Sequence, residues 1–312
     1  MPSTFDARLG RWWSELRHAM RRWRRAAKAQ LPYVRRRQYA KLTRRFDALA
    51  DDVGLGARRA DSARIRSVRA LTTPLGGELC LFLCHQRGPA LASHVLRHVE
   101  HFLAEGVQVV LVLNADDVEA EVRVDDALMG RLSAIYVREN IGFDFAGWAH
   151  VHSLIRPMLR QATRLFLVND SIVGPTDSQR FSALLQRVRG SAADMVGLTE
   201  ALTPIPHLQS FFLVFHRRLA DGAELGRFLD GVLCFREKST VIDVYETRFT
   251  RRMRNAGYSC EALFPALSDD PHASNDTYFR WTELLELGFP YVKASVIREV
   301  GAPAGLGQIA PN

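Results

Sequence analysis

The chain has 312 residues, of which 47% are hydrophobic and 24% are charged, and its formal net charge is +8. This length and apolar fraction suit one large domain or two small ones, and they exclude wholesale disorder. Residues 1–46 carry 14 Lys and Arg against 2 Asp and Glu, a net charge of +12, so the remaining body has a net charge of −4. The basic character of the whole chain therefore says little about what the body binds.

Residues 5–31 have apolar side chains at every third or fourth position, which predicts an amphipathic helix. Trp12, Trp13 and Trp23 belong to the apolar side, and arginines fill much of the other side. This pattern is typical of a helix that lies in the interface of an anionic membrane. A helix that docks on its own body or on a partner has the same pattern, whereas a nucleic-acid interpretation rests on the basic residues alone.

The predicted arm spans residues 1–46, and residues 47–78 are expected to form a connector with room for one short helix. We find no apolar run long enough to cross a bilayer and no apolar core of a signal peptide near the N-terminus. The four cysteines form no CxxC pair, which indicates a reduced, cytosolic chain.

From residue 79 to residue 300, short Val- and Leu-rich runs alternate with amphipathic segments, before a tail over 301–312. The expected strands are 79–84, 107–113, 134–137, 165–168, 195–198 and 211–215, and the expected helices are 90–105, 145–159 and 181–188. This alternation predicts an α/β domain with a parallel or mixed sheet that is covered on both faces. In such sheets the ligand binds beyond the carboxyl ends of the strands.

Polar clusters follow the predicted strands at 114–117, 139–148 and 169–171. Asp and Asn in loops commonly form turns and helix caps. Three clusters at one sheet edge instead favour a site for a diphosphate bound with magnesium or manganese, because these cations prefer oxygen ligands. Neither GxGxxG nor GxxxxGK[ST] occurs, which argues against a dinucleotide enzyme and a P-loop NTPase.

Several segments carry a family resemblance. They are ENIGFDFAGW (139–148), LVNDSIVGP (167–175), VGLTE (196–200), HLQSFFLVF (207–215), VIDVYETRFTRRMRNAGY (241–258) and NDTYFRWTELLELGFPYVK (275–293). In their order and spacing the body, roughly 79–300, resembles the rhamnan-synthesis protein F family, which is glycosyltransferase-like and serves bacterial cell-surface polysaccharide assembly. The resemblance does not extend to the basic arm.

The resemblance implies a nucleotide-diphospho-sugar transferase fold of type A, with a Rossmann-like mixed sheet. In that fold a DxD motif at the end of a central strand holds the metal and the donor diphosphate. Asn169, Asp170 and Ser171 stand at the corresponding place, with one central carboxylate in place of two flanking ones. Asp170 is therefore the candidate metal ligand, and the need for Mg²⁺ or Mn²⁺ stays open because Arg or Lys could neutralise the diphosphate instead.

Other donor-site candidates follow from their place in the pattern. Asp116 or Asp117 would lie near the nucleobase or ribose, and His85 follows the first strand of the body. Asn140, Gly142 and Asp144 resemble the segment that lines the donor pocket. At Gly142 the missing side chain would let the backbone approach the ligand.

Transfer with inversion needs a carboxylate that takes the proton of the acceptor hydroxyl. Glu246 resembles this residue, although an exposed helix glutamate paired with a nearby arginine would give the same local sequence. Asp243 and Glu200 are the next candidates. The candidates for contact with the acceptor are His207, Gln209 and Trp281. The spacing of His94, His98 and His101 suggests zinc, but packing or surface positions on a helix explain it better.

The function expected from these features is a glycosyltransferase at the cytoplasmic face of the plasma membrane. It would move a sugar, rhamnose by resemblance, from a nucleotide-diphosphate donor to a lipid-linked or growing cell-surface polysaccharide. Residues 5–31 would bind the anionic membrane surface, and no nucleic-acid partner is expected, because the acidic body offers no phosphate-binding footprint. The alternative is a non-catalytic member that uses the same fold as a scaffold in polysaccharide assembly.

Overall fold

The computed structural model describes residues 44, 45, 47, 49–53, 56–159, 161–268, 275–301 and 306. The helix predicted over 5–31 lies outside the described residues, as does nearly all of the predicted tail. None of the described helices has both the length and the apolar character that a membrane crossing requires.

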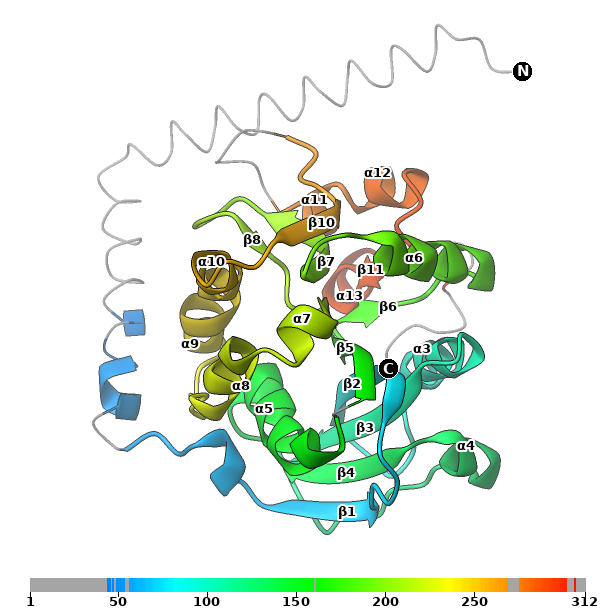
Figure 1. The fold of residues 1–312 in the computed structure, drawn as a ribbon, viewed down its shortest axis with the longest axis vertical. Coiled ribbons are helices and arrows are strands. Elements are labelled where there is room, and N and C mark those ends of the chain that lie inside the picture. The colour runs from blue at the N-terminus through cyan, green and yellow to red at the C-terminus, as the bar shows by residue number, and fades with distance from the viewer. Residues whose placement is uncertain are drawn as a thin grey trace, which may run out of the picture.

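The described part of the chain is built around a nine-stranded sheet (Figure 1). Its order is β1 (Ile65–Arg69), β4 (Ala134–Glu139), β3 (Gln108–Ala115), β2 (Gly76–Gln86), β5 (Gln161–Asn169), β9 (Phe212–His216), β7 (Met195–Ala201) and β10 (Cys260–Phe264), with β8 (His207–Leu208) paired to β7. The four strands from β4 to β5 are parallel, β9 runs antiparallel to both β5 and β7, and β10 is parallel to β7. This arrangement confirms the predicted α/β class with a mixed sheet.

Apolar side chains leave both faces of the sheet, because successive residues of a strand point to opposite sides. In β2 the two sets are Cys80, Phe82 and Cys84 on one face and Leu79, Leu81 and Leu83 on the other. The first set joins a core with α3 (Ser93–Ala104) and α6 (Ser178–Gly190). The second set joins a core with α5 (Phe143–Ile155), α8 (Ala223–Asp230) and α10 (Thr247–Asn255), which lie on the other side of the sheet in Figure 1.

Short elements complete the fold. They are η1 (Ala60–Ser62), α4 (Asp126–Arg131), η2 (Arg156–Met158), β6 (Ile172–Val173), α7 (Arg217–Ala220), α9 (Lys238–Val241), η3 (Ile242–Glu246), α11 (Asp276–Phe279), α12 (Trp281–Glu286), β11 (Val292–Lys293) and α13 (Ala294–Val300). Strands β6 and β11 form a separate two-stranded antiparallel ribbon, the β6–β11 ribbon, in which Lys293 pairs with Ile172. This ribbon fixes the C-terminal part of the chain beside the end of β5.

The expected connector over 47–78 contains a strand that the sequence did not predict. Strand β1 pairs antiparallel with β4 at the edge of the sheet, with Ile65 opposite Arg138. An edge strand hydrogen-bonds on one side only and needs few apolar residues, so its sequence pattern is weak. The expected connector also contacts the body before β1. The Asp52 carboxylate accepts a hydrogen bond from the Arg236 N–H (3.1 Å) and forms an ion pair with the Arg236 side chain.

Candidate functional site

The candidate site lies at one edge of the sheet. The parallel strands β2, β3, β4 and β5 all end at this edge, and the antiparallel strand β9 begins there. The topology therefore brings together residues that are far apart in the sequence, from His85 to the segment 207–210. This is the edge at which open α/β sheets bind their ligands.

The segment that follows β5 is held in place by its own side chains. The Asn169 Oδ1 accepts hydrogen bonds from the Ser171 N–H (3.0 Å) and hydroxyl (2.6 Å), while its Nδ2 donates to Asp144 (2.8 Å). The Asp170 carboxylate accepts a hydrogen bond from the His85 N–H (3.1 Å). These bonds join the ends of β2 and β5 to the first turn of α5, and they hold the carboxylates of Asp144 and Asp170 near the end of β5.

The ionised form of both carboxylates is disfavoured by burial. Burial raises the pKa of Asp170 to about 6, the bond from His85 lowers it and the charge of Asp144 raises it. Burial also raises the pKa of Asp144, and the positive charge of Lys238 opposes this shift. Because the ionised form of each group is disfavoured, a cation or additional hydrogen-bond donors would stabilise this part of the site.

This donor set fits a cation that is shared with a phosphate ligand. Within the described residues no three His, Cys, Asp or Glu side chains form a ready metal site. Magnesium, however, is usually held by one or two carboxylates together with substrate phosphates, and Asp170 with Asp144 matches that pattern. Asn169 and Ser171 bond to each other, so they would have to exchange those bonds to act as neutral ligands.

The candidate base, Glu246, is the last residue of η3 and is largely buried. Its Oε2 accepts a hydrogen bond from the Ser210 hydroxyl (2.5 Å), and its Oε1 lies 3.7 Å from the His207 Nε2. Burial raises the pKa of Glu246, but His207, Ser210 and the charge of Lys293 outweigh it, so the pKa is lowered overall. Glu246 is therefore not the exposed, arginine-paired helix residue that its sequence also permitted.

The same contacts orient His207. Its Nδ1–H donates to the carbonyl of Ile205 (2.7 Å), so the Nε2 faces Glu246. Burial lowers the pKa of His207, but the bonds to Glu246 and Ile205 raise it overall. An imidazole with this raised pKa can carry positive charge beside Glu246 and keep that carboxylate ionised.

Four other predicted residues have contacts away from Glu246. Asp243 forms an ion pair with Arg45 (3.1 Å), and Glu200 accepts a hydrogen bond from the Ala266 N–H (3.1 Å). Gln209 is buried, and its Oε1 accepts a hydrogen bond from the Thr199 hydroxyl (2.7 Å), which joins neighbouring strand segments. Trp281 packs against the small apolar cluster around Val173 and Val292. These contacts give all four residues a structural role.

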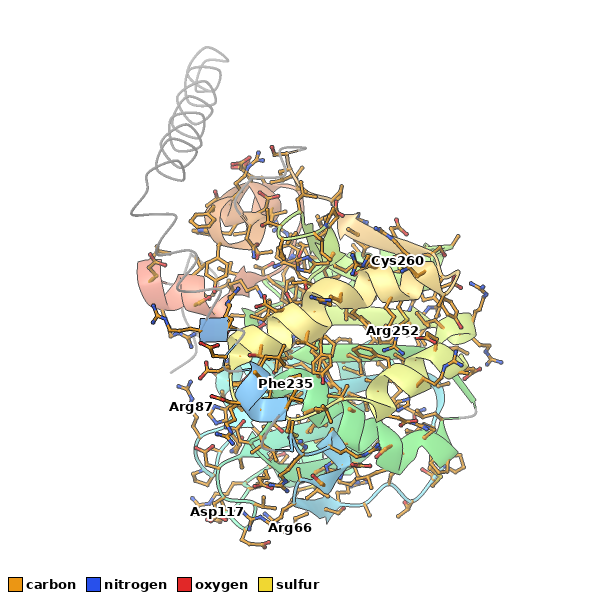
Figure 2. All side chains as sticks on the ribbon, turned by 90° about the vertical axis from the view of Figure 1, so that its left-hand side faces the viewer. Arg66, Arg87, Asp117, Phe235, Arg252 and Cys260 are labelled. Carbon is orange, nitrogen blue, oxygen red and sulfur yellow. The ribbon has the colours of Figure 1, made fainter. Side chains whose placement is uncertain are left out.

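Next to the β5 segment, a second polar group forms at the ends of β2, β3 and β4. The Asn140 Nδ2 donates to Asp116 (2.9 Å) and lies 3.2 Å from the His85 Nε2. Asp117 instead points outward (Figure 2) and accepts the Glu119 N–H (3.0 Å), which makes it a turn residue. Of the two candidates for nucleobase or ribose contact, the structure therefore groups Asp116, and not Asp117, with His85 and Asn140.

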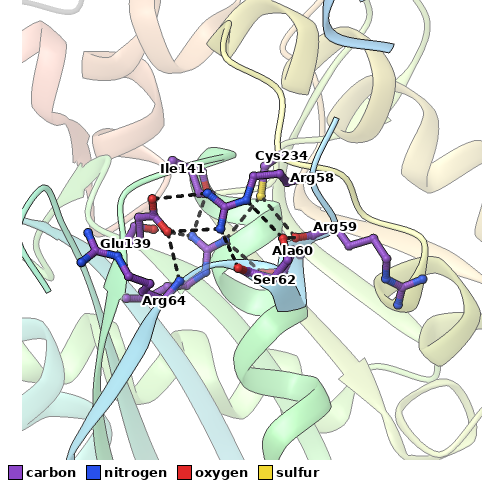
Figure 3. A network of polar contacts seen from close by, with 9 residues as sticks. Arg58, Arg59, Ala60, Ser62, Arg64, Glu139, Ile141 and Cys234 are labelled. Atoms are coloured by element: carbon purple, nitrogen blue, oxygen red, sulfur yellow. Dashed lines mark hydrogen bonds and ion pairs between the residues drawn. The ribbon is translucent and has the colours of Figure 1, made fainter. Parts of the chain in front are cut away.

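A buried arginine, Arg138, fixes the loop after β4, and Figure 3 shows the polar network there, which includes Ala60, Glu139 and Ile141. Arg138 is fully buried and donates to the carbonyls of Glu139 (2.9 Å), Ile141 (2.8 Å) and Ala60 (3.3 Å). Gly142 follows with a φ of 74°, and a Cβ there would come within 2.6 Å of Ala146. Protein atoms thus fill the space beside Gly142, and the glycine serves the packing of this loop as well as the wall of a neighbouring cleft of about 400 Å³.

Three residues at this edge were not singled out from the sequence: Ser210, Lys238 and Lys293. Ser210 and Lys293 lie inside two of the segments that carry the family resemblance, which was the available signal. The Lys293 ammonium lies 4.1 Å from the centre of the Phe211 ring. Burial lowers the pKa of Lys293 to about 8, and the charge of Glu246 opposes this shift. Of the three histidines at helical spacing, His94 and His98 are buried, and His98 packs among aromatic rings of the core, which agrees with the packing positions expected for them.

The chain is similar to a known protein family and to several known proteins. The model of the rhamnan synthesis protein F family matches residues 109–309. The chain is 26% identical over 216 residues to the uncharacterised protein y4gN of Sinorhizobium fredii, an alignment that covers 67% of this chain and 55% of that protein. It is 25% identical over 194 residues to the virulence protein VirA of Vibrio anguillarum, covering 52% of this chain and 61% of the relative.

The chain thus spans little more than half the length of these curated relatives. Among solved structures, it is similar to the catalytic domain of Drosophila β1,4-galactosyltransferase 7 in complex with xylobiose, with a TM-score of 0.34 and 10% identity. That similarity covers 64% of this chain and 72% of the other chain.

Proposed function

Because the chain belongs to the rhamnan synthesis protein F family, we propose that it is a glycosyltransferase of polysaccharide synthesis with a type A nucleotide-sugar transferase fold. It transfers a sugar from a nucleoside-diphosphate donor to a hydroxyl of a growing or lipid-linked glycan. Rhamnose is the proposed sugar, because the family takes its description from rhamnan synthesis. The observation that carries this proposal is that Asp144, Asp170 and Glu246 lie at one edge of the sheet, with Glu246 held by Ser210 and His207.

The donor occupies the ends of β2 to β5. Asp116 and Asn140 offer hydrogen-bonding groups to the nucleoside, and Asp170 with Asp144 faces the diphosphate. A divalent cation held by these two carboxylates supplies positive charge against the diphosphate when it is bound. The bonds from His85 and Asn169 hold the two carboxylates in place before the donor arrives.

Glu246 acts on the acceptor. Its lowered pKa keeps it ionised at neutral pH, so it can take the proton of the acceptor hydroxyl. The acceptor oxygen then bonds to the anomeric carbon, while the bond between that carbon and the diphosphate oxygen breaks and its electron pair leaves with the nucleoside diphosphate. Ser210 and His207 hold the carboxylate, so its geometry is set in advance.

The basic arm supplies the location in this proposal. Residues 1–46 have a net charge of +12 and a Trp-rich apolar stripe, which suits the anionic inner face of the plasma membrane. A lipid-linked acceptor is found at such a surface. A soluble body carried by an interfacial arm would therefore meet its acceptor in two dimensions.

The alternative is a scaffold that keeps the fold without catalysis, and the Asn-Asp-Ser sequence at 169–171 favours it because one carboxylate replaces two. A screen of nucleotide sugars for thermal stabilisation, with and without Mn²⁺, separates the two functions. A ligand that binds the native state must raise the melting temperature. We expect one nucleoside class to stabilise the chain and Asp170→Asn to abolish the effect. If no nucleotide sugar stabilises the wild-type chain, the result supports the scaffold function and contradicts the transferase function.

A further inference from the structure

A pair of lysines stands out against the composition of the chain. Only four of its 42 Lys and Arg residues are lysines, and two of these, Lys28 and Lys41, belong to the basic arm. The body has only Lys238 and Lys293, and both act electrostatically on Asp144 at the candidate site. Arginine is the ordinary basic residue of this protein, so two lysines at one site indicate a need for compact point charges.

Lys293 is anchored to the segment that follows β5. Its backbone pairs with Ile172 in the β6–β11 ribbon, and the next residue, Ala294, donates its N–H to the Ser171 carbonyl (2.9 Å). The side chain lies over the ring of Phe211 (4.1 Å). The carbonyl of Phe211 in turn accepts the Asn169 N–H (3.1 Å). Lys293 is therefore tied to the proposed donor segment on two sides.

The other neighbour of this lysine is the proposed base. Ser210, which precedes Phe211, donates to Glu246, and the charges of Lys293 and Glu246 influence each other's pKa. No carboxylate of the described residues lies within 4 Å of the Lys293 ammonium, so its hydrogen-bonding capacity is not taken up by an ion pair there. The Lys293 ammonium thus acts electrostatically on both Asp144 of the proposed donor site and Glu246, the proposed base.

The charges of the site also call for these lysines. Asp144, Asp170 and Glu246 are three carboxylates at a place where a diphosphate would add further negative charge. Lys238 lowers the pKa of Asp144 and of Asp170, and Lys293 lowers that of Asp144 and of Glu246, so both lysines offset the acidic side chains. Without them, an anionic ligand would meet uncompensated repulsion.

From this geometry we propose that Lys293, assisted by Lys238, forms a subsite for the β-phosphate of a nucleoside diphosphate. The inference rests on the proposed function and adds the side chain that receives the leaving group. Lysine binds phosphate as a point charge, and here the charge is held by a ribbon and an aromatic ring rather than by a flexible loop. A divalent cation held by Asp170 and Asp144 would supply further positive charge beside this subsite.

The test compares diphosphates with monophosphates. Calorimetric titration of the full chain with UDP, dTDP and GDP and with the matching monophosphates, in Mg²⁺ and in EDTA, measures the preference for the β-phosphate. We expect Lys293→Met to weaken diphosphate binding about 10- to 100-fold, the range for a charge-assisted bond, and to change monophosphate binding less than about 3-fold. Lys293→Arg should retain most of the diphosphate preference.

Arg298→Gln is the matched control, because it removes one positive charge from an exposed position on α13, which begins just after Lys293. It should leave both affinities unchanged. An unchanged diphosphate preference in Lys293→Met, or an equal loss for both ligands in a variant that unfolds at the wild-type temperature, overturns the subsite but not the transferase. If the wild-type chain binds none of these nucleotides, the proposed function falls and the subsite falls with it.

Discussion

Asp170→Asn should make the protein more stable while it removes donor binding. The carboxylate of Asp170 is mostly buried beside Asp144, and its pKa rises from 3.8 to about 6. Each pKa unit corresponds to about 1.4 kcal/mol, so the ionised carboxylate costs the folded state up to about 3 kcal/mol. Partial solvent access at this position reduces the expected gain to about 1–2 kcal/mol. The asparagine oxygen can still accept the His85 N–H.

The sign of this effect depends on pH. Above about pH 7 the folded wild-type protein carries the ionised carboxylate and bears the full cost. Below the unfolded value of 3.8, both states hold the proton and the cost disappears. The stability gain of Asp170→Asn should therefore be largest at pH 8, shrink as the pH falls from about 6 to about 4, and be nearly absent below that.

Urea unfolding of both proteins at pH 8 and at pH 4 measures the gain. Asp117→Asn is the matched control, because Asp117 is an exposed turn residue at a neighbouring strand end and should change stability by less than about 0.5 kcal/mol. A variant less stable than wild type at pH 8, or a gain that does not depend on pH, would refute the conclusion that Asp170 is held in a costly ionised state for binding.

Three further outcomes are expected. Gly142→Ala should destabilise the fold by about 2–4 kcal/mol in urea unfolding, because of the φ of 74° and the clash with the helix that follows, whereas Gly88→Ala, with open space around it, should be neutral. His207→Gln should shift the acid limb of the pH–rate profile upward, because it removes a bond that lowers the pKa of Glu246, and an unchanged limb would contradict the role given to the pair. Deletion of residues 1–43 should abolish binding to anionic vesicles and preserve nucleotide binding; retained vesicle binding would exclude the arm as the membrane element.

The sheet and its binding edge were predictable because the signal is local. The apolar runs at 79–84 and 107–113 are buried on both faces, so hydrophobic burial alone marks them as strands of a covered sheet. Strand order then places the polar residues that follow them at one edge. Strand β1 escaped prediction because its pairing with β4 comes from backbone hydrogen bonds at the sheet edge, which leave little trace in side-chain pattern.

The partners of Glu246 could not be predicted in the same way. Ser210 lies just before β9, which runs antiparallel and therefore begins at the edge where the parallel strands end. His207 belongs to β8, which pairs with the last residues of β7 at the same edge. Lys293 reaches this edge through the β6–β11 ribbon, in which it pairs with Ile172, 121 residues earlier in the chain. Contacts of this kind depend on tertiary topology. Residue type and spacing could therefore predict Glu246 as a candidate base, but they could not predict the side chains that contact it.

Sugar transfer to a membrane-extracted acceptor, with the nucleotide sugar that binds the wild-type chain, tests the central claim most directly. Glu246→Gln preserves the shape of the side chain and removes the base, so transfer should fall by about 10²- to 10⁴-fold while donor binding persists. Asp170→Asn should lose both donor binding and transfer. Unchanged transfer in both variants would contradict the assignment of this sheet edge as the place where the sugar is transferred.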